Sequence, residues 1–306
     1  MSARRASLAG SAALVVAWLA AAYWAFPVLR DHAPSIVRRS MSLSTFRIFV
    51  QLLVLGAGGT AFVAIVPEGR RLLGLGAPRP LHLAQALLAA PLAFVTATIV
   101  SVTLALPILL RELAERGAGA SRANAGAFAT ELQESPALVI VLAGALLAPL
   151  GEELLFRGAL YGTVREALAR AMARPVDPDV PIELQRPSPR WLIEGAPLVV
   201  AGAVFAAMHA DMPGGVGVVR VTAAAVLSLF TGLARATTGS VLPGIALHAG
   251  YNGLALLVAR GFFRGSASWS GAPKALVVAG LLGAVLAALA QGLVVRRTRR
   301  APRDAP

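Results

Sequence analysis

Two adjacent glutamates and an arginine lie within a long apolar segment of the chain. Residues 147–162 read "LAPLGEELLFRGALYG" and contain Glu152, Glu153 and Arg157. A charged side chain at the centre of a bilayer costs about 2.5 to 3.5 kcal/mol, whereas a good apolar residue returns only about 0.3 to 0.6 kcal/mol. We therefore expect protein to enclose these three charges, which are either paired or used in chemistry.

Three more polar side chains lie in later apolar runs. His209 lies in "VFAAMHA", and His248 and Asn252 lie in "GIALHAGYN". A carboxylate in a water-poor pocket can take a proton from water near neutral pH, and a nearby histidine can share that water or protonate a leaving amine. A histidine and an asparagine can donate hydrogen bonds to a tetrahedral oxyanion. The set predicts peptide hydrolysis with water as the nucleophile.

The sequence argues against a covalent nucleophile and leaves a metal open. The chain has no cysteine and no G-x-S-x-G serine elbow. Zinc could bind to Glu152, His209 and His248, but no H-E-x-x-H motif occurs and the ligands would come from three helices. We expect no cofactor, with zinc as the alternative.

The spacing of these residues indicates how they pair. Residues four apart share one face of a helix. Three pairs have this spacing: Glu153 with Arg157, Phe205 with His209, and His248 with Asn252. Glu152 is turned about 100° from Glu153, so the two carboxylates are expected to have different partners.

Depth and backbone breaks predict where the residues meet. With about 1.5 Å of rise per residue, Glu152, His209 and His248 reach roughly 20, 20 and 12 Å from the same membrane face. Pro149 and Pro243 are expected to bend or open the backbone and to free carbonyls inside a protein-lined cavity. Small residues four apart, Gly158 and Gly162, form a face that another helix can approach closely.

The composition is that of a membrane protein. The chain has 306 residues, of which 57% are hydrophobic and 14% are charged, compared with about 25% charged in a soluble domain. The net charge of +13 comes mainly from arginines between apolar runs, and no basic stripe with interleaved aromatics points to nucleic acid. The bilayer and a peptide or protein substrate at the membrane are the expected partners.

The fold expected is all-α, a single integral-membrane domain of about eight transmembrane helices around an internal catalytic cavity. The predicted spans are 7–29, 43–66, 81–110, 136–164, 196–210, 216–234, 240–259 and 272–295. The catalytic core is expected at about 136–260, with N-terminal helices at 1–110 and a basic tail at 296–306.

The distribution of basic residues predicts the orientation. The face that holds both termini carries the larger share of the 28 lysines and arginines, with Arg235 counted in a loop on that face. We therefore expect cytoplasmic termini and a multi-pass protein of the inner (plasma) membrane. On the same face, residues 68–80 form a basic amphipathic stretch that could shape substrate access, and 173–190 form a proline-rich linker.

Three motifs together resemble one family. "EELLFR" fits E-E-x-x-x-R, "FAAMH" fits F-x-x-x-H, and "TGSVLPGIALHAGYN" fits T-G-S-x-x-P-x-x-x-x-H-x-x-x-N. This is the pattern of the CAAX-prenyl-protease type II-like family, also called the CPBP or Abi family of intramembrane glutamic endopeptidases. The resemblance covers about residues 136–260 and implies an eight-helix fold with a cavity open to the cytoplasm.

The resemblance also implies roles for the motif residues. Glu152 would be the general base that activates water, with His209 as its partner. His248 and Asn252 would stabilise the oxyanion. Glu153 and Arg157 would organise the site, beside which Phe205 would pack.

Two departures from the family pattern concern specificity. Arg235 stands where many relatives carry an aromatic residue, and the loop at 173–190 is long and proline-rich. Both leave the substrate open, and the arginine-biased, bacterial-looking composition argues against a prenylated CAAX protein.

Two other functions would use the same buried polar residues. A proton-coupled transporter or channel needs a chain of buried Glu, His and Arg side chains, although no paired broken helices occur in matching halves. A non-catalytic membrane scaffold would use these side chains only to join helices.

Overall fold

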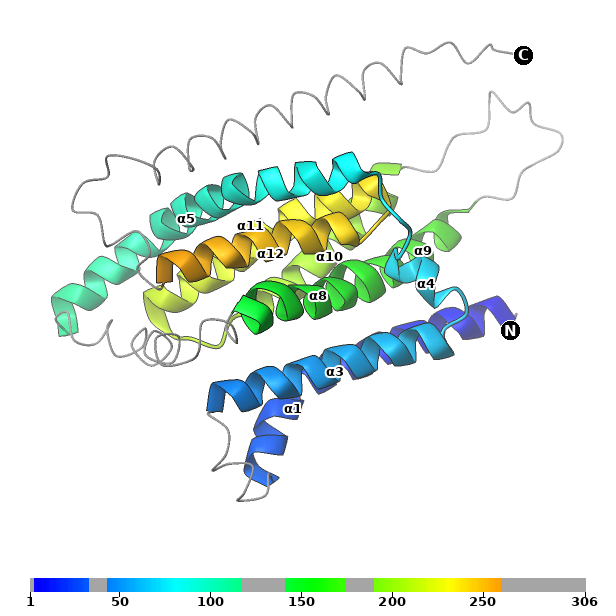
Figure 1. Ribbon diagram of the computed structural model, residues 1–306, viewed down its shortest axis with the longest axis horizontal. Helices are drawn as coiled ribbons and strands as arrows, with labels where there is room; N and C mark the ends of the chain where they lie inside the picture. Colours follow the sequence, from blue (N-terminus) through cyan, green and yellow to red (C-terminus); the bar gives the residue numbers. More distant parts are fainter. Residues whose placement is uncertain (1–2, 33–42, 117–140, 174–189, 260–306) are drawn as a thin grey trace, which may run out of the picture.

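The structure, a computed structural model, describes residues 3–32, 43–116, 141–173 and 190–259 (Figure 1). Within these ranges the chain is helical with connecting turns. The elements are α1 (Ala3–His32), α3 (Leu43–Ile65), α4 (Gly69–Leu73), α5 (Pro80–Arg116), η1 (Val141–Leu147), α8 (Ala148–Glu153), η2 (Leu154–Leu160), α9 (Tyr161–Met172), α10 (Arg190–Ala207), α11 (Gly214–Thr238) and α12 (Leu242–Ala259).

The predicted all-α class is confirmed for these residues, whereas the count of eight spans stays a prediction. In the part of the chain that the structure describes, four helical segments are long and apolar enough to cross a membrane: Leu8–Ala25, Pro80–Glu115, Gly214–Thr238 and Leu242–Ala259. Leu53–Ile65 and Trp191–Ala207 are shorter apolar helices. The predicted span at 272–295 lies outside the described residues, as do most of the 173–190 loop and the 296–306 tail.

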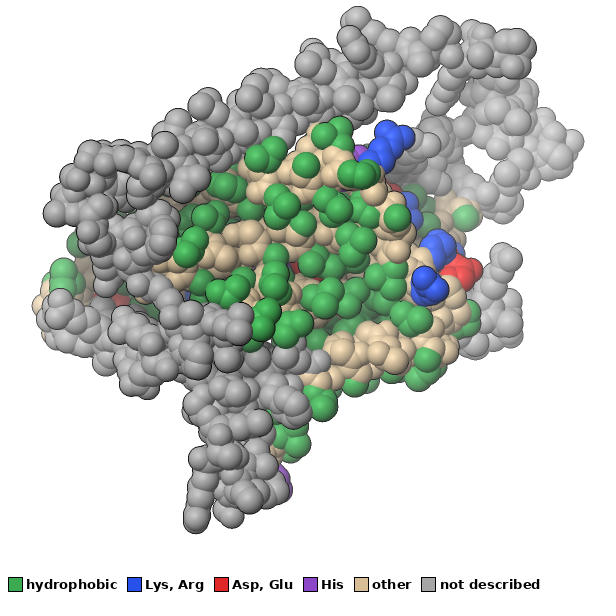
Figure 2. All heavy atoms as spheres, viewed as in Figure 1, with side chains coloured by type: hydrophobic (Ala, Val, Ile, Leu, Met, Phe, Trp, Pro, Cys, Tyr) green, Lys and Arg blue, Asp and Glu red, His purple; other side chains and the backbone are tan. Residues whose placement is uncertain are grey.

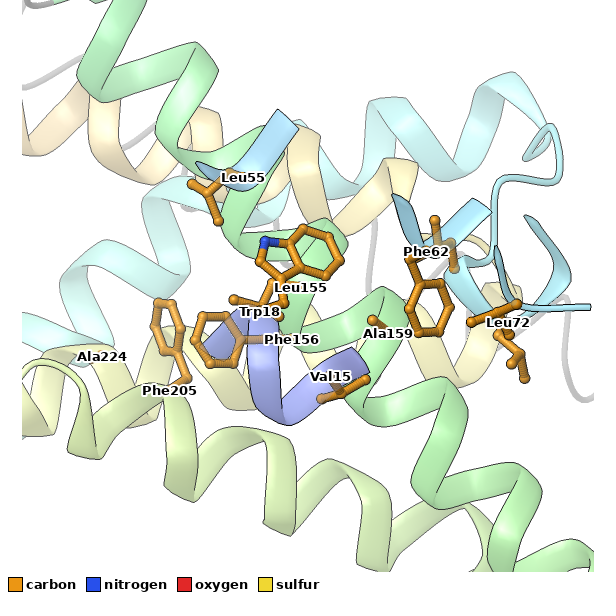
Figure 3. Packing of buried hydrophobic residues seen from close by; sticks show 12 residues of the cluster. Val15, Trp18, Leu55, Phe62, Leu72, Leu155, Phe156, Ala159, Phe205 and Ala224 are labelled. Atoms are coloured by element: carbon orange, nitrogen blue, oxygen red, sulfur yellow. The ribbon is translucent and has the colours of Figure 1, made fainter. Parts of the chain in front are cut away.

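One long helical stretch, from η1 to α9, lies between two groups of helices (Figure 1). Helices α1 and α3 pack together on one side of it, and α5, α10, α11 and α12 form the group on the other side. Buried apolar side chains join the first group to the central stretch, among them Trp18, Phe62, Leu155 and Phe156 (Figure 3). The predicted site residues therefore lie where the central stretch packs against the group formed by α5, α10, α11 and α12.

The central stretch changes its helical type on both sides of the glutamates. Its turns are π-helical in η1 and η2 and α-helical in α8. Proline has no N–H and cannot complete the α-helical bond to the carbonyl four residues earlier, which fits the change near Pro149. At Pro243 the expectation of a bend within a helix is wrong, because α12 begins at Leu242 and a first-turn proline loses no intrahelical bond.

The short helix α4 packs closely against the central stretch. A side chain at Gly162 would overlap the carbonyl oxygen of Leu72, and one at Gly158 would lie 2.9 Å from Cδ2 of Leu73. The small-residue face therefore has a helical partner. Charged side chains visible in Figure 2 gather mostly at the end of the molecule where α4 lies, and hydrophobic side chains cover much of the described surface elsewhere in this view.

Candidate active site

The two glutamates end helix α8 and differ in exposure. The side chain of Glu153 is fully buried, whereas that of Glu152 is 24% exposed. Because successive residues of a helix point in different directions, Glu153 turns toward α12 and the interior, and Glu152 keeps access to the surroundings. A group that must meet water and substrate has to be accessible, so the geometry suits Glu152 as the reactive carboxylate.

His248 of α12 lies against both glutamates. Its Nδ1 is 2.9 Å from Oε1 of Glu153, and its Nε2 is 3.7 Å from Oε2 of Glu152. An ionised carboxylate only accepts hydrogen bonds, so Nδ1 carries a proton and donates to Glu153. The contact with Glu152 is too long for a direct hydrogen bond. His248 is therefore held by Glu153 while its other nitrogen faces Glu152.

Arg157 pairs with Glu153 as the four-residue spacing predicts. Its Nη1 lies 3.1 Å from Oε1 of Glu153, and both side chains are buried. This contact is an ion pair without hydrogen-bond geometry. Among the described residues, Oε2 of Glu153 and both Nη atoms of Arg157 have no hydrogen-bond partner. Glu153 thus has one acceptor oxygen, and Arg157 two donor nitrogens, that make no hydrogen bond within the described residues.

His209 lies just beyond the end of α10. Its Nδ1 is 2.8 Å from the carbonyl oxygen of Phe205. Because a carbonyl only accepts, Nδ1 carries the proton, and Nε2 of the neutral ring is free to accept a proton or a hydrogen bond. The His209 ring packs against Phe205, as does the ring of His248, whose Nε2 faces Glu152.

Phe205 is the aromatic residue around which the site is built. Its ring lies 4.6 Å from the His209 ring and 5.9 Å from the His248 ring, measured between centroids. The guanidinium of Arg157 lies 4.5 Å from the Phe205 centroid, within cation–π distance. Figure 3 shows Phe205 beside Phe156, whose ring it meets edge-on at 5.0 Å. The buried Phe205 ring thus packs against His209, His248 and the guanidinium of Arg157.

Asn252 hydrogen-bonds to the backbone of η1. Its Nδ2 donates to the carbonyl oxygen of Gly144 at 2.8 Å. A carboxamide nitrogen has two hydrogens, so a second one is left for another acceptor. Its role at an oxyanion therefore stays a prediction, and the structure adds a contact that ties α12 to the π-helical turn before the glutamates.

Two further positions contribute to the site, and the sequence motifs do not point to either of them. Gly244 lies beside Glu153, where an added Cβ would be 3.1 Å from Oε2. The interpretation of Arg235 as a loop charge is wrong, because its side chain is buried and its Nε donates to the carbonyl oxygen of Arg157 at 3.0 Å. A glycine in the first turn of a helix and an arginine near a helix end carry no local signal of such contacts.

The candidate zinc ligands can also be compared with the structure. Within the described residues, no group of three His, Cys, Asp or Glu side chains is arranged to hold a metal ion. Glu152 and His248 approach one another, and the Nδ1 of His209 bonds to a backbone carbonyl, which leaves its Nε2 as the nitrogen that could bind a metal. Zinc at Glu152, His209 and His248 therefore stays the alternative to a metal-free site.

A second charged cluster lies near α4, on the side where α9 continues. Glu166 of α9 accepts hydrogen bonds from Arg71 at 2.9 Å and from Arg170 at 2.8 Å. Burial by itself would raise the pKa of Glu166, but the two arginines outweigh it, and the pKa lies below its usual value. The cluster joins α4 to α9 through ionised side chains.

Comparison with known families agrees with this arrangement. Residues 134–254 match the family model described as type II CAAX prenyl endopeptidase Rce1-like. This segment belongs to the Rce1-like family. The resemblance drawn from the three motifs is confirmed, and the Rce1-like segment contains every predicted site residue. The match and the apolar helices support a multi-pass membrane protein of the CAAX-type intramembrane protease kind. Searches of curated proteins and of solved structures found no significant match.

Proposed function

We propose that this protein is an intramembrane endopeptidase that hydrolyses a peptide bond of a membrane-associated protein or peptide, with water activated by Glu152. The observation that carries the proposal is the position of His248, which bonds to a buried, paired Glu153 and faces a more accessible Glu152. The Rce1-like match supports the reaction class.

The charges of the site suit this reaction. With His248 protonated on both nitrogens, Glu152, Glu153, Arg157 and His248 together carry no net charge. When Glu152 takes a proton from water, the site becomes positive by one unit. The hydroxide forms a bond to the peptide carbonyl carbon, and the negative charge that moves to the carbonyl oxygen is then balanced.

The proposal assigns the remaining steps to His248, Asn252 and His209. Nε2–H of His248 and the second N–H of Asn252 are the donors proposed for the oxyanion. Collapse of the tetrahedral intermediate breaks the C–N bond, and the leaving nitrogen takes the proton from Glu152, directly or through Nε2 of His209. Glu152 is thereby ready for the next water.

Peptide cleavage by the purified, full-length protein in lipid nanodiscs tests the proposal. Fluorescence-quenched peptides with and without a farnesyl chain are the substrates. Glu152→Ala and His209→Ala should each lower cleavage about 10²- to 10⁴-fold. Glu115→Gln, which changes an exposed carboxylate at the far end of α5, is the control and should cleave as the unaltered protein does. Cleavage retained by both site variants would contradict the proposal.

Metal dependence is a separate prediction. The proposed mechanism uses no metal, so activity should survive dialysis against a strong chelator. The measurement is the cleavage rate before and after chelation and after zinc is added back. A loss that zinc restores would replace the glutamate mechanism by one with zinc on Glu152, His209 and His248.

The transporter alternative makes a different prediction. It requires pH-driven flux into liposomes that survives loss of His248 and Asn252. The described structure engages these two side chains with Glu153 and with the backbone of η1, which favours a fixed site over a mobile proton path.

A further inference from the structure

Arg235 lies in the last turn of α11, and its buried guanidinium bonds to backbone from three segments. Nε donates to the carbonyl oxygen of Arg157 at 3.0 Å, Nη2 to that of Leu72 at 3.1 Å, and Nη1 to that of Gly239. The guanidinium also lies 5.5 Å from the centroid of the Tyr161 ring. One side chain therefore joins η2, α4 and the turn between α11 and α12.

The acceptors explain why an arginine serves here. Leu72 lies in the last turn of α4 and Gly239 follows the end of α11, where carbonyls lack intrahelical partners and the helix dipole is negative. A planar guanidinium presents donors in several fixed directions, whereas a lysine ammonium is a compact point charge. Arginine can satisfy all three carbonyls at once.

The chain keeps space for this guanidinium. A Cβ at Gly74 would overlap its Cζ, and Gly74 has a φ of 69°. The α4 side and the α11–α12 turn are joined by other bonds as well, since the Val241 N–H donates to the Gly74 carbonyl at 3.0 Å and Ser240 Oγ donates to the Gly76 carbonyl at 2.8 Å. In contrast, the link from Arg235 to η2 is the hydrogen bond to the Arg157 carbonyl.

We propose that Arg235 is a positioning residue for the candidate active site. By holding the carbonyl of Arg157, it sets the π-helical turn that places the Arg157 side chain against Glu153 and Phe205. Glu153 in turn holds His248. Arg235 touches none of the reacting groups and acts through the backbone of η2. Its effect on catalysis rests on the proposed function, whereas its effect on η2 does not.

Hydrogen–deuterium exchange tests the backbone effect without any substrate. In the full-length protein in nanodiscs, Arg235→Lys keeps the charge but cannot reach all three carbonyls. Exchange in peptides covering 154–162 should become about tenfold faster, as expected for losing a buried hydrogen bond to a charged group. Arg79→Lys, at an exposed arginine, is the control. Unchanged exchange at 154–162 would overturn the proposal.

Two glycine variants provide a matched comparison. Gly74 and Gly239 have nearly the same φ, 69° and 71°, so alanine strains both backbones alike. A methyl group at Gly74 meets the guanidinium, whereas one at Gly239 has no atom within 4 Å. Gly74→Ala should therefore speed exchange at 154–162 about as much as Arg235→Lys, and Gly239→Ala should do so far less. Equal effects of both glycine variants would show that Arg235 does not control η2.

Kinetics test the link to catalysis. Arg235→Lys should lower kcat about tenfold with little change in KM, because the reacting groups shift while the substrate contacts stay. If Arg235 acts through Arg157, its substitution should cost much less activity in an Arg157→Lys background. Additive losses, or a loss expressed in KM, would contradict positioning. Should the unaltered protein cleave no peptide, the proposed function fails, and the exchange measurements still decide the role of Arg235.

Discussion

Glu153 is fully buried, and its single Oε1 serves both Arg157 and His248. A buried carboxylate is tolerated only when opposite charges and donors surround it. Removing one member of such a group leaves the other charge uncompensated in an apolar setting. We therefore expect Glu153 to be needed both for stability, as the counterion of Arg157, and for activity, as the group that holds His248.

Glu153→Gln should lower the free energy of unfolding by about 3 to 5 kcal/mol, because the buried Arg157 charge loses its counterion. Thermal unfolding in detergent measures the effect. The double variant Glu153→Leu with Arg157→Met should recover much of this stability, since an apolar pair replaces the ion pair. It should remain inactive because His248 has lost its acceptor. If Glu153→Gln were as stable as the unaltered protein, the prediction that Glu153 and Arg157 form a stabilising buried ion pair would be wrong.

At the scale of elements, the approach of α4 to the central stretch depends on residues without side chains. A Cβ at Gly162 would overlap backbone, the carbonyl oxygen of Leu72, and backbone yields less readily than a flexible side chain. Arg235 binds this same carbonyl. The packing of α4 and the position of η2 are therefore connected.

Gly162→Ala should lower the free energy of unfolding by about 1 to 3 kcal/mol, as overpacking does. Gly195→Ala is the matched control, because Gly195 lies in α10 with no atom within 4 Å of an added Cβ. It should raise stability by about 0.4 to 1 kcal/mol, through a less flexible unfolded chain. Chemical denaturation in detergent measures both. The contact between α4 and the central stretch would be in doubt if both variants behaved alike.

The Glu166 cluster predicts how the α4–α9 contact depends on pH. The pKa of Glu166 is lowered on folding, so its stabilisation is complete above the unfolded-state value of about 4.3 and is lost as pH falls through the lower folded-state value. Glu166→Gln should be less stable by about 1 kcal/mol at pH 7, and the difference should close below about pH 4. Melting temperatures across pH measure this, and a difference that persisted at about pH 3 would contradict it.

At the scale of the whole molecule, α5 spans the protein and extends beyond a bilayer. Its 37 residues rise about 55 Å, compared with a hydrocarbon thickness of about 30 Å. Near its end, Glu112 accepts a hydrogen bond from the Gly215 N–H at 3.1 Å, at the start of α11. The helix thus connects the end near α4 with the opposite end of the described structure.

Labelling of single cysteines should establish the orientation. The chain has no cysteine of its own, so Arg79→Cys and Glu115→Cys each introduce a unique thiol. Both positions are exposed, and they lie near opposite ends of α5. With cytoplasmic termini, a membrane-impermeant maleimide should label Glu115→Cys in intact spheroplasts and Arg79→Cys only in inverted vesicles. The reverse pattern would place the termini outside.

The sequence by itself determined the features that arise from local geometry and from the cost of burying charge. The apolar runs predict the helices, the four-residue spacing predicts the Glu153–Arg157 pair and the Phe205–His209 contact, and three motifs identify the family. Each of these depends on residues close together in the chain, or on a pattern that needs no coordinates.

Only the tertiary structure decided which groups meet across helices. His248 reaches Glu153 from 95 residues away, Asn252 binds the Gly144 carbonyl from 108, and Arg235 binds the Arg157 carbonyl from 78. Such pairings depend on how helices cross, on π-helical turns and on where glycines let backbones approach, and hydropathy and spacing specify none of these. In the sequence, Arg235 resembles the loop arginines that set the orientation of a membrane protein. In the structure its side chain is buried and bonds to three backbone carbonyls.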